Sequence, residues 1–439
     1  MPRRKKTEDT AIKVKSIKTP QLVRGMKDIL PVDQKYWRFL NSRVESIAVD
    51  YSYRRIETPI LENISLFTHA IGKQTDIVEK EMFVFLDKGG DKLVLRPEGT
   101  APIARAYIDH GMLNLPQPVK LYYSGSMFRH ERPQSGRLRE FHQTGFEIIG
   151  DGSPAIDAEL ILIAYNLFKD LGIEVNVQVN SIGELGDREN YRKALLDYYK
   201  NKKASLCVDC KKRILKNPLR LLDCKNPKCA KLKENAPQMV DYLSDDARNH
   251  FFRLLEYLDE LQIPYNLNQF LVRGMDYYNR TVFEFWEKED TEGRNALGGG
   301  GRYDYLLEML GGRETPGCGF AVGVERALGV LKEKRVQLPE ALTPDIFLAQ
   351  IGEQARRRAM GFFEELRKSG LRVAANFSKG SLKSQLDLAN KLGVKIVLIL
   401  GQREIVDETI LMRDMDSGIQ EVVNFKKIIN EVKRKLEKH

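Results

Sequence analysis

The spacing of apolar and polar residues predicts two strands joined by a charged loop in the first half of the chain. Residues 119–123 alternate, and a second run of strand character lies at 141–149. Alternation with a period of two is typical of a strand that buries one face. Pro133 and the pair Ser135-Gly136 lie between the two runs, as expected for a loop. We therefore predict a strand, a charged loop and a second strand.

Similar patterns predict further elements before residue 340. Apolar residues at helical spacing predict a long helix from about Val32, and the pair Ser153-Pro154 predicts the start of another. Residues 92–96 and 173–179 have the character of strands. These segments predict a domain of mixed helices and strands.

The pattern changes between residues 183 and 257, where it becomes helical and basic and includes four of the five cysteines. We interpret this segment as an inserted, mostly helical domain. The predicted organisation is a basic N-terminal arm (1–20), a domain built from 21–182 and 258–335, the insertion (183–257) and a C-terminal domain (343–439).

Strands alternate with helices in the C-terminal part of the chain. The expected strands lie at 345–351, 372–377 and 394–400, and the expected helices lie at 355–369 and 382–392. Such alternation predicts a small, largely parallel sheet. A basic helix is expected to close the chain, and its basic residues include Lys426, Lys427, Lys433, Arg434 and Lys435.

Composition adds a charge argument. The 439 residues carry a formal net charge of +10, and 42% of them are hydrophobic and 30% charged, as in soluble globular proteins. The positive excess favours a nucleic-acid partner. No apolar run is long enough to span a bilayer, and the basic segment Met1–Lys6 lacks the apolar stretch of a secretory signal. We expect a cytoplasmic protein with no membrane partner.

The charged loop is the first candidate for a functional site. Its four arginines are Arg129, Arg132, Arg137 and Arg139. Guanidinium groups bind phosphate oxygens through paired donors, so the loop suits a polyanionic ligand, although a mobile, solvated loop is the alternative. Gln143, Gly145 and Glu147 share one face of the following strand. This polar face predicts the floor of a pocket.

The cysteines form a second candidate site. Cys207 and Cys210 make one pair, and Cys224 and Cys229 make a second. This spacing is close to that of zinc sites, in which four thiolates surround the ion as a tetrahedron. The second pair is wider than usual, so plain thiols stay the alternative to a structural zinc ion.

Several segments resemble known signature sequences. Phe-Arg-His-Glu at 128–131 and the run 141–147 resemble motif 2 of the class II aminoacyl-tRNA synthetases. Motif 1 is resembled by the long helix from about Val32 together with residues 53–61, a strand interrupted by Pro59, and residues 317–327 resemble motif 3. The resemblance implies an α+β catalytic domain on an antiparallel sheet, followed by an α/β anticodon-binding domain, with a homodimer built through motif 1.

Two more segments narrow the resemblance to the histidyl-tRNA synthetase family. Leu-Val-Arg-Gly-Met-Asp-Tyr-Tyr at 271–278 and Gly-Gly-Gly-Gly-Arg-Tyr-Asp at 298–304 are similar to the histidine-binding signatures of that family. From its residues alone, the glycine run is expected to be a turn that enters a helix, with backbone amides able to cradle an anion. The resemblance covers nearly the whole chain.

The resemblance implies a two-step reaction. ATP, accompanied by Mg²⁺, activates L-histidine to histidyl-adenylate, and the histidyl group then moves to the 3′ end of tRNA(His). The implied catalytic residues are Arg129 at the α-phosphate and the histidine carboxylate, Arg273 at the α-phosphate and Arg326 at the γ-phosphate. Phe141 is implied to stack on adenine, and Glu131 to contact the base or another part of ATP.

The resemblance also implies the histidine and tRNA sites. The residues for the α-amino group are Glu98, Thr100 and Gln143, and those for the imidazole are Glu147, Tyr278 and Tyr303. The tRNA acceptor end is implied to face Arg132, Gln134, Arg137 and Arg139. The insertion could be an arm that embraces the acceptor stem.

Three alternatives stay open. An inactive relative that regulates ATP phosphoribosyltransferase shares the catalytic fold but usually lacks the anticodon domain. A non-catalytic nucleic-acid-binding protein would account for the charge but not for the polar pocket residues. A class II synthetase for another amino acid would not account for the segment 273–278.

Overall fold

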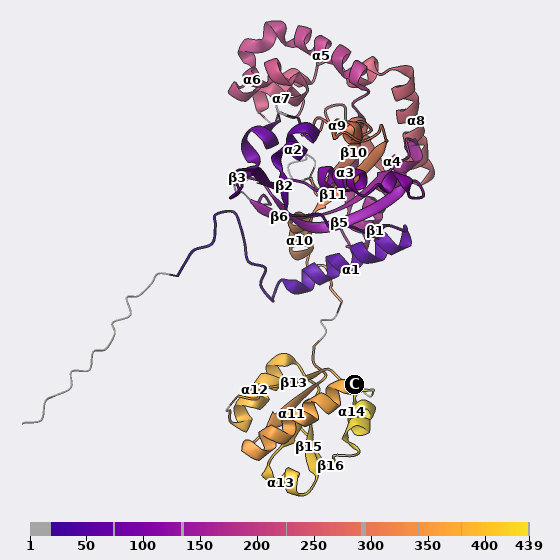
Figure 1. Cartoon of the computed structure of the whole chain (residues 1–439). Helices are drawn as coiled ribbons and strands as arrows, with labels where there is room; N and C mark the ends of the chain where they lie inside the picture. The colour runs from indigo at the N-terminus through magenta and orange to yellow at the C-terminus, as the bar shows by residue number, and fades with distance from the viewer. Residues whose placement is uncertain are drawn as a thin grey trace, which may run out of the picture. The chain divides into compact units, whose positions relative to one another are not determined.

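The structure is a computed structural model that describes residues 19–72, 75–132, 136–224, 226–290, 296–339, 343–378 and 380–437, apart from the side chains of Leu215 and Lys216. It has two compact units, Met1–Leu338 and Pro339–His439 (Figure 1). The predicted N-terminal arm lies outside the described residues except for its last two positions. In the described ranges, no helix combines the length and the apolar character needed to cross a membrane.

An eight-stranded sheet forms the centre of the first unit (Figure 1). Its strands are β1 (Arg54–Arg55), β5 (Val119–Phe128), β6 (Glu140–Ile149), β7 (Val175–Ser181), β8 (Tyr265–Leu267), β9 (Asn279–Glu287), β10 (Gly298–Arg302) and β11 (Gly317–Gly323). Their order is β1-β5-β6-β11-β10-β9-β7-β8, with parallel pairing only at the two edges among the described strands. The antiparallel sheet and the two predicted strands, which are β5 and β6, are confirmed, while Pro133 and Ser135 of the predicted loop lie outside the described residues.

Helices pack on both faces of this sheet, because successive side chains of each strand point to opposite faces. One core contains residues of α1 (Gln34–Asp50), α4 (Pro154–Asp170), α8 (Asp245–Glu260) and α10 (Val324–Glu333). The other contains residues of α2 (Ile64–Ala70), α3 (Thr100–Asp109) and α9 (Leu306–Met309). As predicted, Ser153 caps α4, and its Oγ accepts a hydrogen bond from the N–H of Ala155 at 3.2 Å.

A second, three-stranded sheet comprises β2 (Leu61–Asn63), β3 (Phe83–Leu86) and β4 (Lys92–Leu95). The predicted strand 53–61 is divided at Pro59, with β1 before it and β2 after it, because proline cannot donate to a strand ladder. Large apolar side chains are exposed at Ile60, Leu61, Val84, Phe85 and Leu86, on or next to β2 and β3.

The glycine run is a strand of the central sheet, which corrects the expectation of a turn entering a helix. β10 pairs with β11 on one side and β9 on the other, so its backbone belongs to the sheet and does not form an anion cradle. A Cβ at Gly300 would lie 2.0 Å from the carbonyl oxygen of Gly319. Glycine is required here because the neighbouring backbone approaches too closely for any side chain.

The inserted segment has its own small core. Its helices are α5 (Leu185–Tyr199), α6 (Val208–Lys216) and α7 (Pro227–Lys233), with short 3₁₀ turns between them, including η4 (Pro218–Leu221). The core includes Tyr191, Leu195 and three of the cysteines. In contrast, Phe251 and Leu258 of α8 are buried in the main core with the sheet. The second half of α8 therefore packs on the sheet, while 183–257 stays the predicted extent of the insertion.

The second unit contains one five-stranded sheet of order β13-β12-β14-β15-β16. Its strands are β12 (Ile346–Gln350), β13 (Val373–Ala375), β14 (Ile396–Leu400), β15 (Thr409–Asp414) and β16 (Gln420–Asn424), and its helices are α11 (Glu353–Lys368), α12 (Leu382–Leu392), α13 (Gln402–Val406) and α14 (Ile428–Leu436). The predicted strands and helices are confirmed. Among the described strands of this unit, only β12, β13 and β14 are parallel, since the unpredicted β15 and β16 pair antiparallel. Lys426 and Lys427 precede the basic helix.

Candidate functional site

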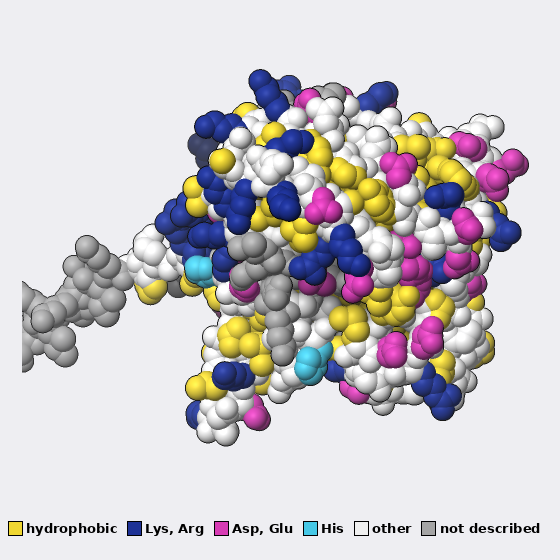
Figure 2. Space-filling model, turned by 90° about the horizontal axis from the view of Figure 1, so that it is seen from above, with side chains coloured by type: hydrophobic (Ala, Val, Ile, Leu, Met, Phe, Trp, Pro, Cys, Tyr) yellow, Lys and Arg dark blue, Asp and Glu magenta, His cyan; other side chains and the backbone are white. Residues whose placement is uncertain are grey.

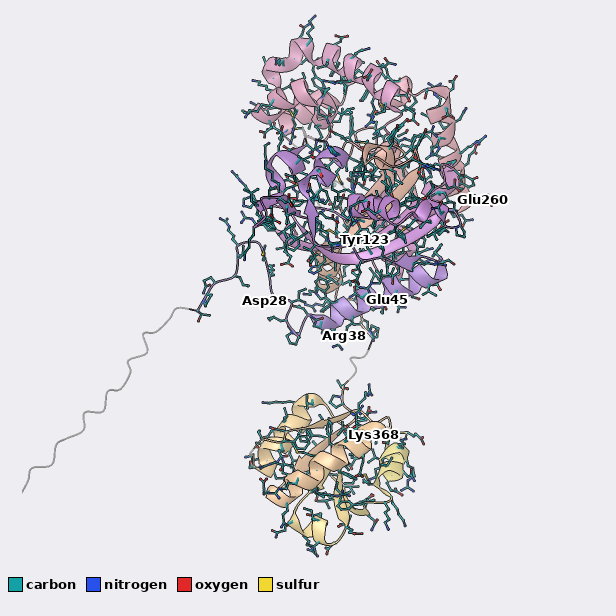
Figure 3. All side chains as sticks on the ribbon, in the orientation of Figure 1. Asp28, Arg38, Glu45, Tyr123, Glu260 and Lys368 are labelled. Atoms are coloured by element: carbon teal, nitrogen blue, oxygen red, sulfur yellow. The ribbon has the colours of Figure 1, made fainter. Side chains whose placement is uncertain are left out.

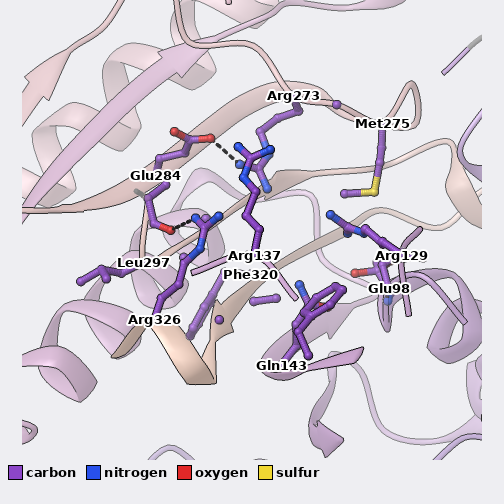
Figure 4. A pocket seen from close by; sticks show the side chains of 18 of the residues that line it. Glu98, Arg129, Arg137, Gln143, Arg273, Met275, Glu284, Leu297, Phe320 and Arg326 are labelled. Carbon is purple, nitrogen blue, oxygen red and sulfur yellow. Dashed lines mark hydrogen bonds and ion pairs between the residues drawn. The ribbon is translucent and has the colours of Figure 1, made fainter. Parts of the chain in front are cut away.

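A cavity of about 350 Å³ opens on the central sheet and collects most of the predicted site residues (Figure 4). Those that line it are Glu98, Thr100, Arg129, Glu131, Arg137, Phe141, Gln143, Arg273, Tyr278 and Arg326. They come from α3, β6 and α10, from the loop between β5 and β6, and from the turns before α3 and β9. Regions that are distant in the sequence therefore meet because the strand order places β6, β11, β10 and β9 side by side.

Arg129 lies just after β5, at one wall of the cavity. Its Nε donates to the carbonyl oxygen of Pro97 at 2.9 Å, and its guanidinium lies 5.2 Å from the ring centroid of Phe141. The backbone carbonyl fixes the direction of the side chain, and Figure 4 shows Arg129 beside Glu98. A positioned guanidinium beside a flat ring can bind a phosphate next to a base.

Arg326 and Arg273 lie on the opposite side of the cavity (Figure 4). Arg326 donates through Nη1 to the carbonyl oxygen of Ala296 at 2.5 Å and through Nε to that of Gly136 at 3.2 Å. Burial and then the nearby Arg137 lower the pKa of Arg326. Arg273 donates to the carboxylate of Glu284 at 2.8 Å. The cavity thus concentrates cationic groups, which favours a polyanionic ligand.

Glu98 lies just before α3 and accepts hydrogen bonds from the first turn of this helix. Its carboxylate oxygens accept hydrogen bonds from the N–H groups of Thr100 at 2.7 Å and Ala101 at 2.8 Å. Burial raises the pKa of Glu98. Glu98 therefore caps the start of α3 with its carboxylate, and its side chain also belongs to the cavity wall.

Gln143 points into the cavity from β6 (Figure 4). Its Oε1 is buried and has no hydrogen-bond partner among the described residues. A buried acceptor without a partner costs about 1–3 kcal/mol. Such an atom suits a ligand that brings its own donor, for example an ammonium group.

Glu147 and Tyr303 do not line the cavity and lie one layer below it. The hydroxyl of Tyr303 donates to Oε2 of Glu147 at 2.6 Å, and the hydroxyl of Thr100 donates to Oε1 at 2.8 Å. Burial raises the pKa of Glu147 to about 8. Thr100 connects this buried carboxylate to the cavity, because it contacts Glu147 and also belongs to the lining.

The loop arginines separate into different positions. Arg137 forms an ion pair with Glu131 at 3.2 Å at the rim, whereas Arg132 is exposed. Arg139 donates through Nε to the carbonyl oxygen of Glu131 at 3.3 Å, and its N–H donates to Gly25. Gln134 lies outside the described residues. Of the four arginines, Arg129 points inward and Arg137 stands at the entrance.

Three further residues belong to the site and were not predicted. Tyr123 lies in the interior of the unit (Figure 3) and has room because a Cβ at Gly99 or Gly145 would come within 2.3 or 2.5 Å of its ring. Glu284 holds Arg273. Glu325 accepts from the backbone N–H of His142, its neighbour across β6 and α10, at 2.9 Å. The absence of bulk at Gly145 was the available signal for Tyr123.

The four predicted cysteine ligands converge in the insertion. The Sγ atoms of Cys207, Cys210, Cys224 and Cys229 all lie within 4.8 Å of one another. Cys207 is half-buried at the start of α6, and the other three are buried. The N–H of Cys207 donates to Sγ of Cys229 at 3.3 Å. Four thiols at these separations match the ligand set of a tetrahedral metal site.

Comparisons with known proteins agree with this geometry. A family model described as histidyl-tRNA synthetase matches residues 25–327, and one described as an anticodon binding domain matches residues 345–435. A histidine–tRNA ligase of Dehalococcoides mccartyi is 46% identical over 417 residues, which cover 95% of this chain and 100% of the relative. That of Geobacillus kaustophilus is 43% identical and covers 91% and 95%. The crystal structure of apo histidyl-tRNA synthetase from S. aureus matches with a TM-score of 0.79 at 33% identity, covering 94% of this chain and 100% of that chain.

The fold defines a class II aminoacyl-tRNA synthetase, with a large, mostly antiparallel sheet in the first unit and a second unit that matches an anticodon binding domain. The family model and the full-length relatives then specify the amino acid. The chain belongs to the histidyl-tRNA synthetase family.

Proposed function

We propose that this chain joins L-histidine to tRNA(His) in two steps, with ATP and Mg²⁺ in the first. The observation that carries this conclusion is the cavity in which Arg129, Arg273 and Arg326 face the polar strand of Gln143. In the first step, a carboxylate oxygen of histidine attacks the α-phosphorus of ATP, and pyrophosphate leaves. In the second, a ribose hydroxyl of the tRNA attacks the carbonyl carbon of the adenylate, and AMP leaves.

The arginines promote the first step by position and charge. We assign Arg129 to the α-phosphate and the histidine carboxylate, Arg273 to the α-phosphate, and Arg326 to the γ-phosphate. Preorganised cations stabilise the negative charge of the transition state without reorganising during the reaction. Mg²⁺ that accompanies ATP neutralises further phosphate charge. Phe141, which lies in the same lining, is assigned to stack on the adenine. Glu131, also in the lining, is assigned to contact the base or another part of ATP.

Histidine recognition is assigned to the floor and the layer below it. Gln143 Oε1, with Glu98 and Thr100 beside it in the lining, suits the α-amino group. Tyr278 lines the cavity where an imidazole would lie, and Glu147 and Tyr303 support this position from below. A carboxyl group with a pKa near 8 can match either protonation state of an imidazole nitrogen.

We assign tRNA contacts to both units. The acceptor end enters at the motif 2 loop, where Arg132, Arg137, Arg139 and Gln134 are the proposed contacts. The second unit, which matches the anticodon binding domain, supplies the anticodon contacts. Because charged tRNA is used at the ribosome, we also propose a cytoplasmic location.

We propose a homodimer that covers the three-stranded sheet. Its surface includes Leu61, Phe85 and Leu86, which are 45%, 42% and 64% exposed. Large exposed apolar groups that lie together favour association with another surface. Sedimentation velocity of the wild-type chain tests this proposal, and a monomer at micromolar concentration contradicts it.

We also propose that Cys207, Cys210, Cys224 and Cys229 hold one structural Zn²⁺ ion. Four thiolates and no open position are typical of structural zinc sites. The alternative, four buried thiols that act as small apolar groups, also fits their burial. The metal content of the purified protein separates these alternatives.

ATP–pyrophosphate exchange with single amino acids tests the activation step. We expect exchange with histidine and none with the other amino acids, in the absence of tRNA. The regulatory relative without catalysis, or a nucleic-acid-binding protein, predicts no exchange with any amino acid. A subsequent assay with tRNA(His) tests the transfer step separately.

A further inference from the structure

A second, larger groove of about 1310 Å³ lies between the insertion and the catalytic domain. Ile77, Arg129, Arg137 and Gly274 line both this groove and the catalytic cavity. The two spaces therefore meet at the entrance formed by Arg129 and Arg137. A chain that passes along the groove can bring its end to the reacting atoms.

The insertion contributes a basic wall to this groove. Its basic residues are Lys211, Arg213, Arg220, Lys228 and Lys231. Acidic residues also line the groove, but basic side chains outnumber them. Figure 2, which looks down on the first unit, shows Lys and Arg side chains gathered on one part of this face. A basic groove of this kind follows a phosphate backbone.

Every basic residue of this wall lies within four positions of a clustered cysteine. Lys211 and Arg213 follow Cys210 on α6, and Lys228 and Lys231 flank Cys229 on α7. Arg220 precedes Cys224 on η4. The cysteines and the basic side chains are therefore interleaved on or directly beside the same short elements, and whatever orients the cysteines also orients the wall.

The elements of the wall are too short to be stable alone. α6 has 9 residues, η4 has 4 and α7 has 7. Isolated helices of fewer than about 12 residues are marginal in water. Such elements need an external constraint, and a metal ion that binds all of them at one point supplies it.

The sulfur geometry fits such an ion. Zinc–sulfur bonds of about 2.3 Å place the sulfurs of a tetrahedral site about 3.8 Å apart. The separation of Cys207 Sγ and Cys224 Sγ is 3.9 Å. The N–H groups of Cys207 and Cys210 donate to the sulfurs of Cys229 and Cys207, at 3.3 and 3.4 Å. Donors of this kind stabilise thiolates over thiols.

One carboxylate at present holds two arginines of the wall. Asp76, just before the π-helical turn η1 (Ile77–Glu81), lies 3.3 Å from Nη2 of Arg213 and 3.6 Å from Nη2 of Arg220. Asp76 also pairs with Lys80 at 3.0 Å. A phosphate group could replace this carboxylate, because it offers the same anionic oxygens to a guanidinium.

We propose that a metal ion on the four cysteines orders the basic wall for the second step alone. The wall binds backbone phosphates at the 3′ end of the tRNA, with Arg213 and Arg220 exchanging Asp76 for phosphate. The ion is therefore required for histidine transfer and dispensable for histidine activation. This inference rests on the two-step function proposed above and extends it to the role of the metal.

Cobalt substitution and split kinetics test the proposal. Wild-type protein prepared with Co²⁺ should show intense thiolate-to-metal absorption at one ion per chain, and the variant Cys224→Ser with Cys229→Ser should lose it. That variant should keep ATP–pyrophosphate exchange within about twofold and charge tRNA about 10- to 100-fold more slowly. Cys318→Ala is the matched control, because Cys318 lies in the main core, and it should keep the cobalt spectrum.

A second variant separates lost metal from lost charge. Arg213→Ala with Arg220→Ala should keep the cobalt spectrum and the exchange activity while slowing transfer by a similar factor. An absence of bound metal in the wild type, or normal transfer by the metal-free cysteine variant, overturns the proposal. Failure of the wild type to exchange pyrophosphate with histidine overturns the proposed function instead, whatever the metal content.

Discussion

The catalytic sheet and the insertion both hold cationic side chains in place, but by different means. In the catalytic cavity, Arg129 after β5 and Arg326 on α10 each donate to a backbone carbonyl oxygen, and β5 and α10 each contribute buried residues to the large apolar cores of the first unit. In the insertion, Arg213 and Arg220 are held by one carboxylate of another element, Asp76, and their own elements surround a cluster of cysteines. One region is rigid through its backbone, whereas the other depends on a local constraint.

This difference corresponds to the chemistry of the two steps. Adenylate formation depends on the positions of a few atoms, so its cations need fixed geometry. Binding an RNA strand depends on summed phosphate contacts, which tolerate larger changes in position. We infer that damage to the sheet stops the first step, while damage to the insertion slows the second.

Of the variants considered, Arg129→Ala should reduce the rate of the first step most strongly. Removing one preorganised donor from a transition state costs about 100- to 1000-fold in rate, and Arg129 is assigned to both the phosphate and the carboxylate. We expect the rate of pyrophosphate exchange to fall by about 1000-fold, while the midpoint of thermal unfolding changes little. An exchange rate near that of the wild type would remove Arg129 from the catalytic residues.

Glu147→Gln should reduce histidine activation by about 100-fold with little change in the KM for ATP. The loss should be large, because the variant leaves a buried group of the bound histidine without its hydrogen-bond partner. Exchange kinetics with histidine and ATP varied separately measure the two effects. Equal losses for both substrates would contradict a role at the imidazole.

The pH dependence of folding stability provides a control for the Glu147→Gln variant. Burial raises the pKa of Glu147 from 4.5 to about 8, so the folded protein retains a proton that the unfolded chain loses. Stability therefore falls as pH rises from about 4.5 to 8 and levels off above. In chemical denaturation, the free energy of unfolding of Glu147→Gln should lack the part of the pH dependence that comes from Glu147. An unchanged pH dependence would show that other groups cause it.

Local sequence signals predicted the parts of the fold that depend on local contacts. Ser153 and Pro154 mark the start of α4, because a capping side chain and a fixed dihedral act within one turn. The alternation around 119–149 predicted β5 and β6, and it also placed Gln143 and Glu147 on one face. The antiparallel pair β15 and β16 was not predicted, although β15 alternates in burial.

Contacts between distant residues account for the features that were missed. The glycines of β10 were interpreted as a turn, because the reason for them is the carbonyl oxygen of Gly319 on the next strand. A Cβ at Gly319 would in turn lie 1.6 Å from Oε2 of Glu147, so this glycine allows the carboxylate to lie below the cavity. No single segment carries that information.

Glu284→Gln should have a smaller effect and lower the exchange rate by about tenfold. It tests how far the position of Arg273 in the catalytic cavity depends on one carboxylate. Glu284 pairs with Arg273 at 2.8 Å, and the proposed phosphate contact is made by Arg273 and not by Glu284. We regard it as a positioning residue, since it orients the guanidinium through one charge-assisted hydrogen bond worth about 1.5–3 kcal/mol. A larger loss in kcat than in KM supports positioning, and Glu284→Asp should recover part of the rate.

Removal of the metal should have the smallest effect on activation and a local effect on structure. The constraint proposed for the insertion acts on α6, η4 and α7, whereas the main core contains none of the four cysteines. After treatment with a strong chelator, removal of the chelator and return of Mg²⁺, we expect exchange activity within about twofold of the untreated value, since distant sites are usually independent. Limited proteolysis should then cleave between residues 200 and 240 first, because local constraints determine local opening. Cleavage spread evenly over both regions would show that the metal stabilises the whole unit, and the two regions would no longer be distinct.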